Sequence, residues 1–375
     1  MSRFSILMVL VVLCSVVWRS SVADGHQAET ATGLKDPRIG QKVIVTHAGA
    51  ELRTPVATVW KGYVGEVFTV SLTNGEWLWI HEKGGWLWEK QCIPFDTATE
   101  MLTERIVQQK SGENYHLRGV AYLAHQQYDK AIADFTESLR LQPENAGALN
   151  NRGQTRYLME DYKAAVQDYT AAIAIDAKNP LVLNNRALAY LELADLSNAM
   201  IDLQAALKLV PQYPEALNNR GVVYQQRQEF DKAIADFTEA LKLDSKYVDA
   251  LENRALSYVE INDHAKAIAD LESAIQLSPH SYEAANDLAW LLATTTEDSV
   301  RNKQRALMLA KQACAVTEYK QWNTLDTLAA AYAANGQFAD AKKWLGTAIA
   351  LAPEDEKKRL QIHLELVMAE KRVQD

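Results

Sequence analysis

Asparagine is the residue type whose spacing most clearly indicates chemistry in this sequence. It recurs at intervals of 34 residues, singly or as an Asn-Asn pair, at Asn150, Asn151, Asn184, Asn185, Asn218, Asn219 and Asn253. A carboxamide has both donor and acceptor atoms, so a row of them can hydrogen-bond to a peptide backbone whatever its side chains are. The spacing therefore predicts a site for an extended peptide. The alternative is that these amides contact only water.

Tryptophan is the second residue type that gathers in one segment. Five of the nine tryptophans lie between residues 36 and 95: Trp60, Trp77, Trp79, Trp86 and Trp88. Because alternate residues of a strand share a face, Trp77 and Trp79 lie on one face and Leu78 and Ile80 on the other. Exposed indoles can form a groove for a peptide or a glycan, and the candidate groove residues are Trp77, Trp79, Trp86 and Trp88. Alternatively, they pack the core of this segment and its contact with the helices.

The sequence contains no arrangement of residues that is typical of catalysis. It has no phosphate-binding loop, no Gly-x-Ser-x-Gly and no His-Glu-x-x-His, and its eight histidines are scattered. Cys92 and Cys314 lie in different segments without the spacing of a disulfide framework or a zinc site. We therefore expect no catalytic residues, no metal and no cofactor, and hence no enzyme.

The asparagines belong to a pattern of 34 residues that occurs five times between residues 112 and 281. We number each copy from position 1 to position 34. Position 8 is always Gly or Ala, position 20 is always Ala, and position 24 is large. Apolar residues recur at spacings of three and four in two blocks, which predicts two amphipathic helices per copy. The copies begin at Gly112, Ala146, Pro180, Pro214 and Val248.

Two charged positions recur with the same regularity. Position 7 is Arg and position 23 is Asp in all five copies, whereas two later, divergent copies have Leu288 with Leu309 and Leu328 with Trp344. These positions lie on different helices, and their joint loss predicts an ion pair between the two helices of a copy. The alternative is common ancestry of the copies without contact.

The pattern resembles the tetratricopeptide repeat (TPR) family. The resemblance implies a mainly α fold, a solenoid of helical hairpins in which the first helix of each copy lines a concave groove for a protein or an extended peptide. Some TPR superhelices hold peptides with asparagine rows. The carboxylate-clamp variant of the family needs basic residues at positions 2, 5 and 6. Here Glu215, Asp249 and Glu252 occupy some of these positions, so we do not expect capture of an acidic tail.

The remaining segments complete the predicted organisation. Residues 1–23 have an early arginine, an apolar run and small residues before position 24, which is typical of a cleaved signal peptide. The alternative, a retained membrane anchor, would need a longer apolar run. Residues 24–35 read as a linker. We therefore expect a secreted or periplasmic protein with no stable membrane span after cleavage.

Residues 36–95 are predicted to form a small all-β barrel. They contain β-branched runs and Asn74-Gly75, a hairpin signal, between two apolar segments. The layout resembles a bacterial Src-homology-3-like (SH3-like) domain. A capping helix is expected at 96–111, five regular TPR repeats at 112–281, two divergent repeats at 282–355, and a final capping helix at 356–375.

Net charge limits the partners of the chain. The formal net charge is −9, and residues 1–23 hold two arginines and no acid, so the chain from residue 24 onward carries −11. This charge opposes binding to nucleic acid. Two functions remain: a non-enzymatic protein- or peptide-binding scaffold outside the cytoplasm, or a cell-envelope targeting protein whose barrel binds wall peptides or glycans.

Overall fold

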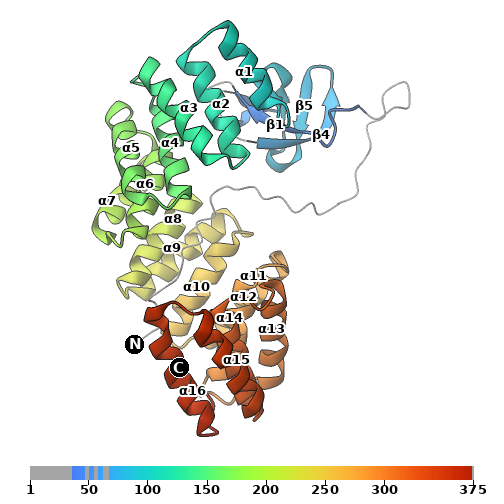
Figure 1. Ribbon diagram of the computed structural model, residues 1–375, viewed down its shortest axis with the longest axis vertical. Helices are drawn as coiled ribbons and strands as arrows, with labels where there is room; N and C mark the ends of the chain where they lie inside the picture. Colours follow the sequence, from blue (N-terminus) through green and yellow to red (C-terminus); the bar gives the residue numbers. More distant parts are fainter. Residues whose placement is uncertain (1–35, 47–49, 55–57, 62–66, 374–375) are drawn as a thin grey trace. The chain divides into compact units, whose positions relative to one another are not determined.

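The structure is a computed structural model that describes residues 36–46, 50–54, 58–61 and 67–373 (Figure 1). The predicted signal peptide (1–23) and linker (24–35) lie outside the described residues. The chain divides into two compact units, Met1–Leu209 and Val210–Asp375, and each is described by itself. Among the helices that are described, we find none whose length and apolar character would allow it to cross a membrane.

The first unit begins with a small antiparallel sheet, as the β-rich sequence predicts. Its described strands are ordered β3-β2-β6-β5-β4-β1-β7. Two short 3-10 turns, η1 (His81–Lys83) and η2 (Glu89–Gln91), follow β5 and β6. The strands are β1 (Lys42–Val45), β2 (Glu51–Arg53), β3 (Thr58–Lys61), β4 (Val67–Asn74), β5 (Trp77–Ile80), β6 (Gly85–Trp88) and β7 (Cys92–Pro94).

The predicted hairpin is present between β4 and β5. Asn74 pairs with Trp77 across the turn, and Gly75 has a φ of +61°, which only glycine adopts at little cost. Leu78, Ile80 and Leu87 point into the core of the sheet and are almost fully buried. The alternation along β5 and β6 therefore leaves the tryptophans on the opposite face.

Helix α1 (Ala98–Gln108), within the predicted capping segment, joins the sheet to the repeats. Its Ala98 and Leu102 share one buried cluster with Ile44 of the sheet and Leu117 of the first repeat. This packing covers apolar surface that an open end of the repeat array would expose.

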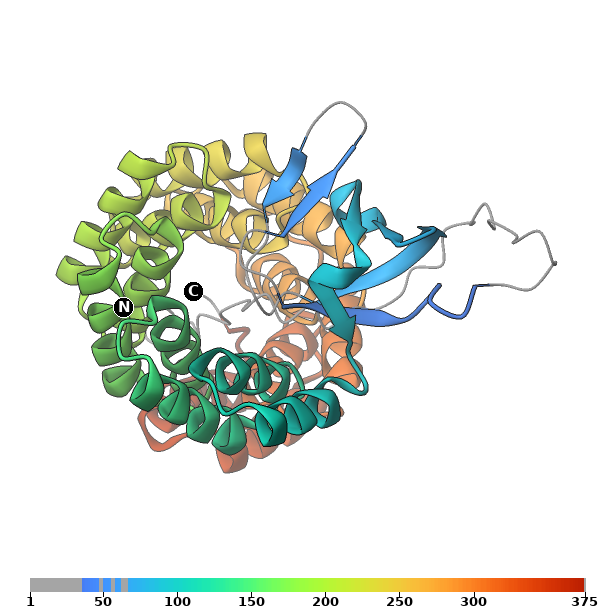
Figure 2. The ribbon, with the colours of Figure 1, turned by 90° about the horizontal axis from the view of Figure 1, so that it is seen from above.

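Helices α2 to α7 form three hairpins in the first unit and follow one another around an arc (Figure 2). Each hairpin corresponds to one 34-residue copy, which confirms the prediction of two helices per copy. The helices are α2 (Gly112–Ala124), α3 (Tyr128–Leu141), α4 (Ala146–Leu158), α5 (Tyr162–Ile175), α6 (Pro180–Glu192) and α7 (Leu196–Leu209).

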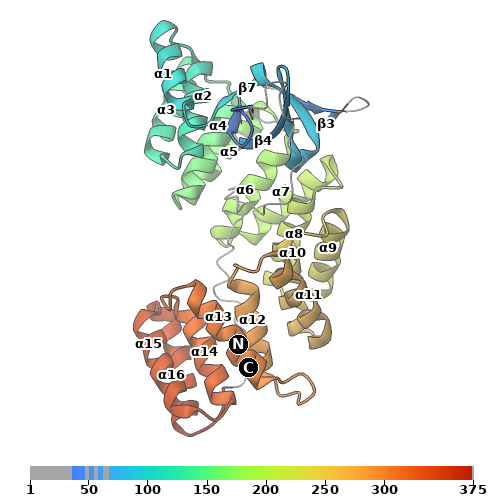
Figure 3. The same ribbon diagram turned by 90° about the vertical axis from the view of Figure 1, so that its right-hand side faces the viewer.

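The second unit contains the last two regular copies, the two divergent copies and a final helix (Figure 3). The sixth copy has an insertion between its helices at residues 295–302. The helices are α8 (Pro214–Gln226), α9 (Phe230–Leu243), α10 (Val248–Glu260), α11 (His264–Leu277), α12 (Glu283–Thr294), α13 (Lys303–Val316), α14 (Trp322–Ala334), α15 (Phe338–Leu351) and α16 (Glu354–Met368).

Close packing within each hairpin depends on positions 8 and 24. The glycines at position 8 lie against the ring of an aromatic residue at position 24, whereas the copies with alanine at position 8 have leucine at position 24. A methyl group added at Gly221 would lie 2.5 Å from the ring of Phe237. The pairs are Gly119–Phe135, Gly153–Tyr169 and Gly221–Phe237, against Ala187–Leu203 and Ala255–Leu271. The two positions therefore compensate each other in size.

The turn between the two helices of a copy uses a left-handed residue at position 15. In the regular copies this residue is never glycine: it is Gln126, Glu160, Ala194, Gln228 or Asn262, whereas the seventh copy has Gly336. Each non-glycine residue in this conformation carries a cost of about 1–2 kcal/mol.

Ala194→Gly should therefore stabilise the protein. Ala194 is exposed and has a φ of +57°, so the substitution relieves backbone strain without removing a buried contact. After the entropic cost of glycine, the free energy of unfolding should rise by about 0.5–1 kcal/mol in urea titrations. Gly336→Ala, at a φ of +76°, is the matched control and should lower the free energy of unfolding. A loss of stability in Ala194→Gly would contradict this account.

Candidate functional site

The asparagines of consecutive first helices bond to one another. Position 6 of one copy donates to position 5 of the copy before it: Asn185 Nδ2 lies 3.1 Å from Asn150 Oδ1 in the first unit, and Asn253 Nδ2 lies 3.1 Å from Asn218 Oδ1 in the second. Within a copy, Asn150 Nδ2 also donates to Asn151 Oδ1 at 3.3 Å. Within each unit, the amides therefore form a hydrogen-bonded row along the first helices, here called the asparagine row, a pairing that sequence reasoning missed.

Burial separates the two asparagine positions. The position 5 residues Asn150, Asn184 and Asn218 are buried, with exposed fractions of 4–8%. At position 6, Asn151 and Asn185 are half-buried, whereas Asn219 and Asn253 are buried. A carboxamide can form about four hydrogen bonds, so Asn151 and Asn185 keep bonding capacity beyond the row.

At the start of the row, His116 stands in the place of an asparagine and bonds to the asparagine of the next copy. It stands at position 5 of the first copy, and its Nε2 lies 3.0 Å from Asn151 Nδ2. Burial lowers the pKa of His116 to about 4, so the ring is neutral at pH 7 and one nitrogen can accept a hydrogen bond as an amide oxygen does. This role could not be predicted from the sequence, since Leu117 interrupts the run of asparagines at position 6.

The predicted ion pair is confirmed in all five regular copies. Each arginine of position 7 donates from Nε and Nη2 to both carboxylate oxygens of the aspartate at position 23, at 2.7–2.9 Å. The aspartates are 2–8% exposed, so the pairs lie within the helix packing. They are Arg118–Asp134, Arg152–Asp168, Arg186–Asp202, Arg220–Asp236 and Arg254–Asp270.

Three of these arginines also connect their copy to the preceding copy. Arg186 Nη1 donates to the hydroxyl of Thr170 on the second helix of the preceding copy, at 3.1 Å, and Arg152 and Arg254 make the same contact. In the second copy, Arg156 replaces the usual tyrosine of position 11 and adds a further bond to Asp168 at 2.8 Å. The network is therefore structural: it fixes how the helices pack.

The four predicted tryptophans of the sheet lie together on one face. Trp77 pairs with Trp88 and Trp79 with Trp86 across β5 and β6. The rings of Trp79 and Trp86 pack edge to face, with 5.2 Å between their centroids. None of the four is buried, and Trp77 is 38% exposed. The core is filled by the leucine and isoleucine face instead. The side chain of Trp60 lies outside those described.

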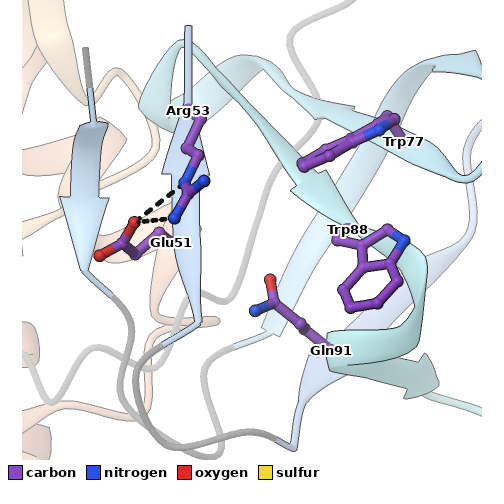
Figure 4. Close-up of a pocket in the computed structure, with 5 residues that line it drawn as sticks. All are labelled: Glu51, Arg53, Trp77, Trp88 and Gln91. Carbon is purple, nitrogen blue, oxygen red and sulfur yellow. Dashed lines mark hydrogen bonds and ion pairs between the residues drawn. The ribbon is translucent and has the colours of Figure 1, made fainter.

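A cavity of about 270 Å³ opens on this face, lined by Glu51, Arg53, Trp77, Trp88 and Gln91 (Figure 4). In the view of Figure 4, the two indoles lie on one side and the Glu51–Arg53 ion pair, at 2.7 Å, on the other. The cavity therefore combines flat apolar rings with a carboxylate, a guanidinium and an amide.

Both described cysteines are buried and free. Burial raises the pKa of Cys92 to about 12 and that of Cys314 to about 11, so both thiols stay protonated at neutral pH. They are packing residues, in line with the absence of a disulfide spacing in the sequence.

The comparisons with known proteins identify the repeats. Sequence profiles described as tetratricopeptide repeat match residues 116–180, 181–213, 214–247 and 248–281 without a gap. Residues 116–281 are therefore TPR repeats, a fold that generally serves as a protein-binding scaffold. A search of curated proteins found no match.

One solved structure supports the same fold, and a second is similar over most of the chain. The chain is similar to one in the crystal structure of the APC/C hetero-tetramer Cut9-Hcn1, with a TM-score of 0.55, 18% identity, and coverage of 62% of this chain and 45% of that chain. It thus spans less than half the length of that relative. A tetratricopeptide repeat protein from Parabacteroides merdae gives a TM-score of 0.49 and 20% identity, with coverage of 72% of this chain and 99% of that chain.

Proposed function

We propose that this protein is a non-enzymatic scaffold that acts outside the cytoplasm and holds an extended peptide segment of a partner along the asparagine row. The observation that carries this proposal is the row itself: amides of successive first helices are held in place by one another. Asn151 and Asn185 are half-buried and keep hydrogen-bonding capacity. Fixed amides of this kind suit a peptide backbone, whose donors and acceptors alternate.

The location outside the cytoplasm is supported by the signal-like residues 1–23. The absence of a catalytic arrangement in the sequence agrees with a scaffold, and TPR folds typically serve that role. The ligand is therefore proposed as a protein or peptide segment rather than a small substrate.

Replacing Asn151 and Asn185 together by Ala should weaken peptide binding. Screening an array of ten-residue peptides with the full chain would first identify a bound sequence. The double variant should then bind that peptide about thirtyfold more weakly in calorimetry, because each lost hydrogen bond contributes about 1 kcal/mol. Asn198→Ala, on the exposed face of α7, is the matched control. Equal affinity of wild type and double variant would show that the asparagine row does not contribute to peptide binding.

A second candidate function follows from the tryptophan face of the sheet. We propose that the sheet is an SH3-like domain whose cavity binds a cell-wall peptide or glycan, while the repeats recruit the partner protein. Indole rings stack on the apolar faces of sugars and peptides, and Glu51, Arg53 and Gln91 supply polar contacts that orient a ligand. This arrangement favours a ligand with both apolar and polar faces.

Replacing Trp77 and Trp88 by Ala should abolish retention on purified cell wall. Both side chains lie on the outer face, so folding should persist, as a thermal melt would show. We expect at least a tenfold loss of the bound fraction, because stacked aromatic side chains contribute about 1 kcal/mol each. Trp344→Ala, on α15 far along the sequence, should leave retention unchanged. Wild-type protein that does not sediment with cell wall would exclude this function.

A further inference from the structure

Between the fifth and sixth copies, two acids replace one amide pair of the asparagine row. Position 5 of the fifth copy is Glu252 and position 6 of the sixth is Asp287, the two positions whose equivalents Asn218 and Asn253 bond to each other. Position 2 of these copies is also acidic, with Asp249 and Glu283. These four residues, here called the acidic group, lie on α10 and α12 (Figure 3). Two carboxylates therefore stand where an amide pair is found elsewhere.

The acidic group brings four carboxyl groups close together. Glu252 accepts a hydrogen bond from the Ala284 backbone N–H and lies within electrostatic reach of Asp249, Glu283 and Asp287. Among the described residues, neither Glu252 nor Asp249 forms an ion pair with a basic side chain. Burial and then the three neighbouring carboxylates raise the pKa of Glu252 to about 9.

Two buried acceptor atoms at this place have no hydrogen-bond partner in the part of the chain that the structure describes: Glu252 Oε1 and Asn286 Oδ1. Asn286 is only 5% exposed, and its amide donates to Asp287 of the acidic group at 3.4 Å. In the second and fourth copies, the equivalent oxygen of position 5 accepts from an asparagine of the next copy. The seventh copy has Thr327 in place of that asparagine. When Glu252 is ionised, both atoms can only accept hydrogen bonds, so both then lack a donor.

We propose that the acidic group binds a lysine or arginine side chain of the peptide held by the repeats. This inference rests on the proposed peptide-binding function and names the charge that the ligand carries. An ammonium or guanidinium group has several donors and no acceptor, so it supplies what Glu252 and Asn286 lack. Its charge also offsets the repulsion within the acidic group.

The placement of the acids suits one cationic side chain. Asp249 and Glu252 are three residues apart on α10, and Glu283 and Asp287 are four apart on α12, so each pair lies on one face of its helix. In the carboxylate-clamp variant of the TPR family, positions 2, 5 and 6 hold basic residues that bind a carboxylate. Here acids occupy such positions, so the site would bind a cation instead. A basic residue of the ligand would thus be selected at one point of the peptide, beyond the sequence-independent amide contacts.

Binding of a cation should release a proton. Below pH 9 the free protein holds Glu252 largely protonated, whereas the complex needs its carboxylate, so affinity rises with pH. The groups that face Glu252 are Asp249 on its own helix and Glu283 and Asp287 on α12, with Tyr282 beside them. Between pH 6 and pH 8 the affinity should rise by up to tenfold per pH unit. Lysine, with a pKa near 10.4, stays charged throughout this range.

The test uses the full chain and an array of ten-residue peptides, each present in a form with one lysine and in the same form with norleucine. Norleucine keeps the length of the side chain and removes the charge. We expect the lysine forms to bind at least tenfold more tightly at pH 8 and the preference to shrink at pH 6. The variant Glu252→Asn with Asp287→Asn recreates the amide pair of the other copies, and it should fold, melt no lower than wild type, and lose the lysine preference.

A control variant removes two acids elsewhere, Asp231→Asn with Glu239→Gln on α9, and should keep the preference, which excludes a general effect of net charge. Equal binding of lysine and norleucine forms would overturn the acidic site and leave peptide binding standing. A lysine preference that survives in the Glu252 and Asp287 variant would also overturn it. If no peptide of either form binds, the proposed function itself fails, and this inference fails with it.

Discussion

Asp202→Ala is expected to lower the free energy of unfolding by about 3–5 kcal/mol, because it leaves the guanidinium of Arg186 without its buried partner. Asp202 is 2% exposed and accepts two bonds from Arg186 at 2.7 Å. The hydrogen bond and ion pair with Asp202 raise the pKa of Arg186 in the wild type, and an arginine stays charged in proteins even without such a partner. Urea titration followed by circular dichroism would measure the loss.

The matched variant removes both charges. Arg186→Leu with Asp202→Leu imitates the sixth copy, where Leu288 and Leu309 are both buried at these positions. Because buried ion pairs contribute little net stability against apolar side chains of similar size, the double variant should lose much less than Asp202→Ala. The contact of Arg186 with Thr170 is lost as well, at a cost of about 1 kcal/mol. If the loss in the double variant equals the sum of the single losses, the two residues are not coupled.

The ion pair also shows what could be predicted from one sequence. Arg and Asp occur together in five copies and disappear together in two, so the comparison of copies within the chain carries the information that an alignment would. The contact between Arg186 and Thr170 was not predicted, because it joins two neighbouring copies. The pattern is also interrupted, since the residue equivalent to Thr170 is Gln204 in the copy that precedes Arg220. Periodicity thus reveals contacts within a copy more readily than contacts between copies.

The hydrogen-bond partners within the asparagine row could not be predicted from the sequence. The spacing located these residues, and amide chemistry agreed equally with peptide, water or another amide as partner. Only the positions of the first helices show that Asn185 reaches Asn150 and that His116 substitutes for an asparagine. The same holds for the tryptophans: alternation predicted that Trp77 and Trp79 share a face, but both faces of β5 are apolar, so burial could not be assigned from the sequence.

Gly221→Ala is expected to lower the free energy of unfolding by about 1–3 kcal/mol, although alanine favours a helix over glycine by about 1 kcal/mol. The added methyl group would meet the ring of Phe237 at 2.5–2.8 Å, and Phe237 is fully buried and cannot move aside. Gly346→Ala is the matched control: Gly346 lies in helix α15 with nothing near its added methyl group. That variant should gain up to about 1 kcal/mol.

A second change should repair the first. Phe237→Leu alone opens a cavity and should lower the free energy of unfolding by about 1–2 kcal/mol. In Gly221→Ala with Phe237→Leu, the methyl group fills part of the space that the ring vacates, as Ala255 and Leu271 do in the next copy, where both are buried. The double variant should therefore be more stable than the sum of the single losses predicts, by about 1–2 kcal/mol. Strict additivity in urea titrations would show that positions 8 and 24 do not compensate each other, and that the spacing between the two helices is set elsewhere.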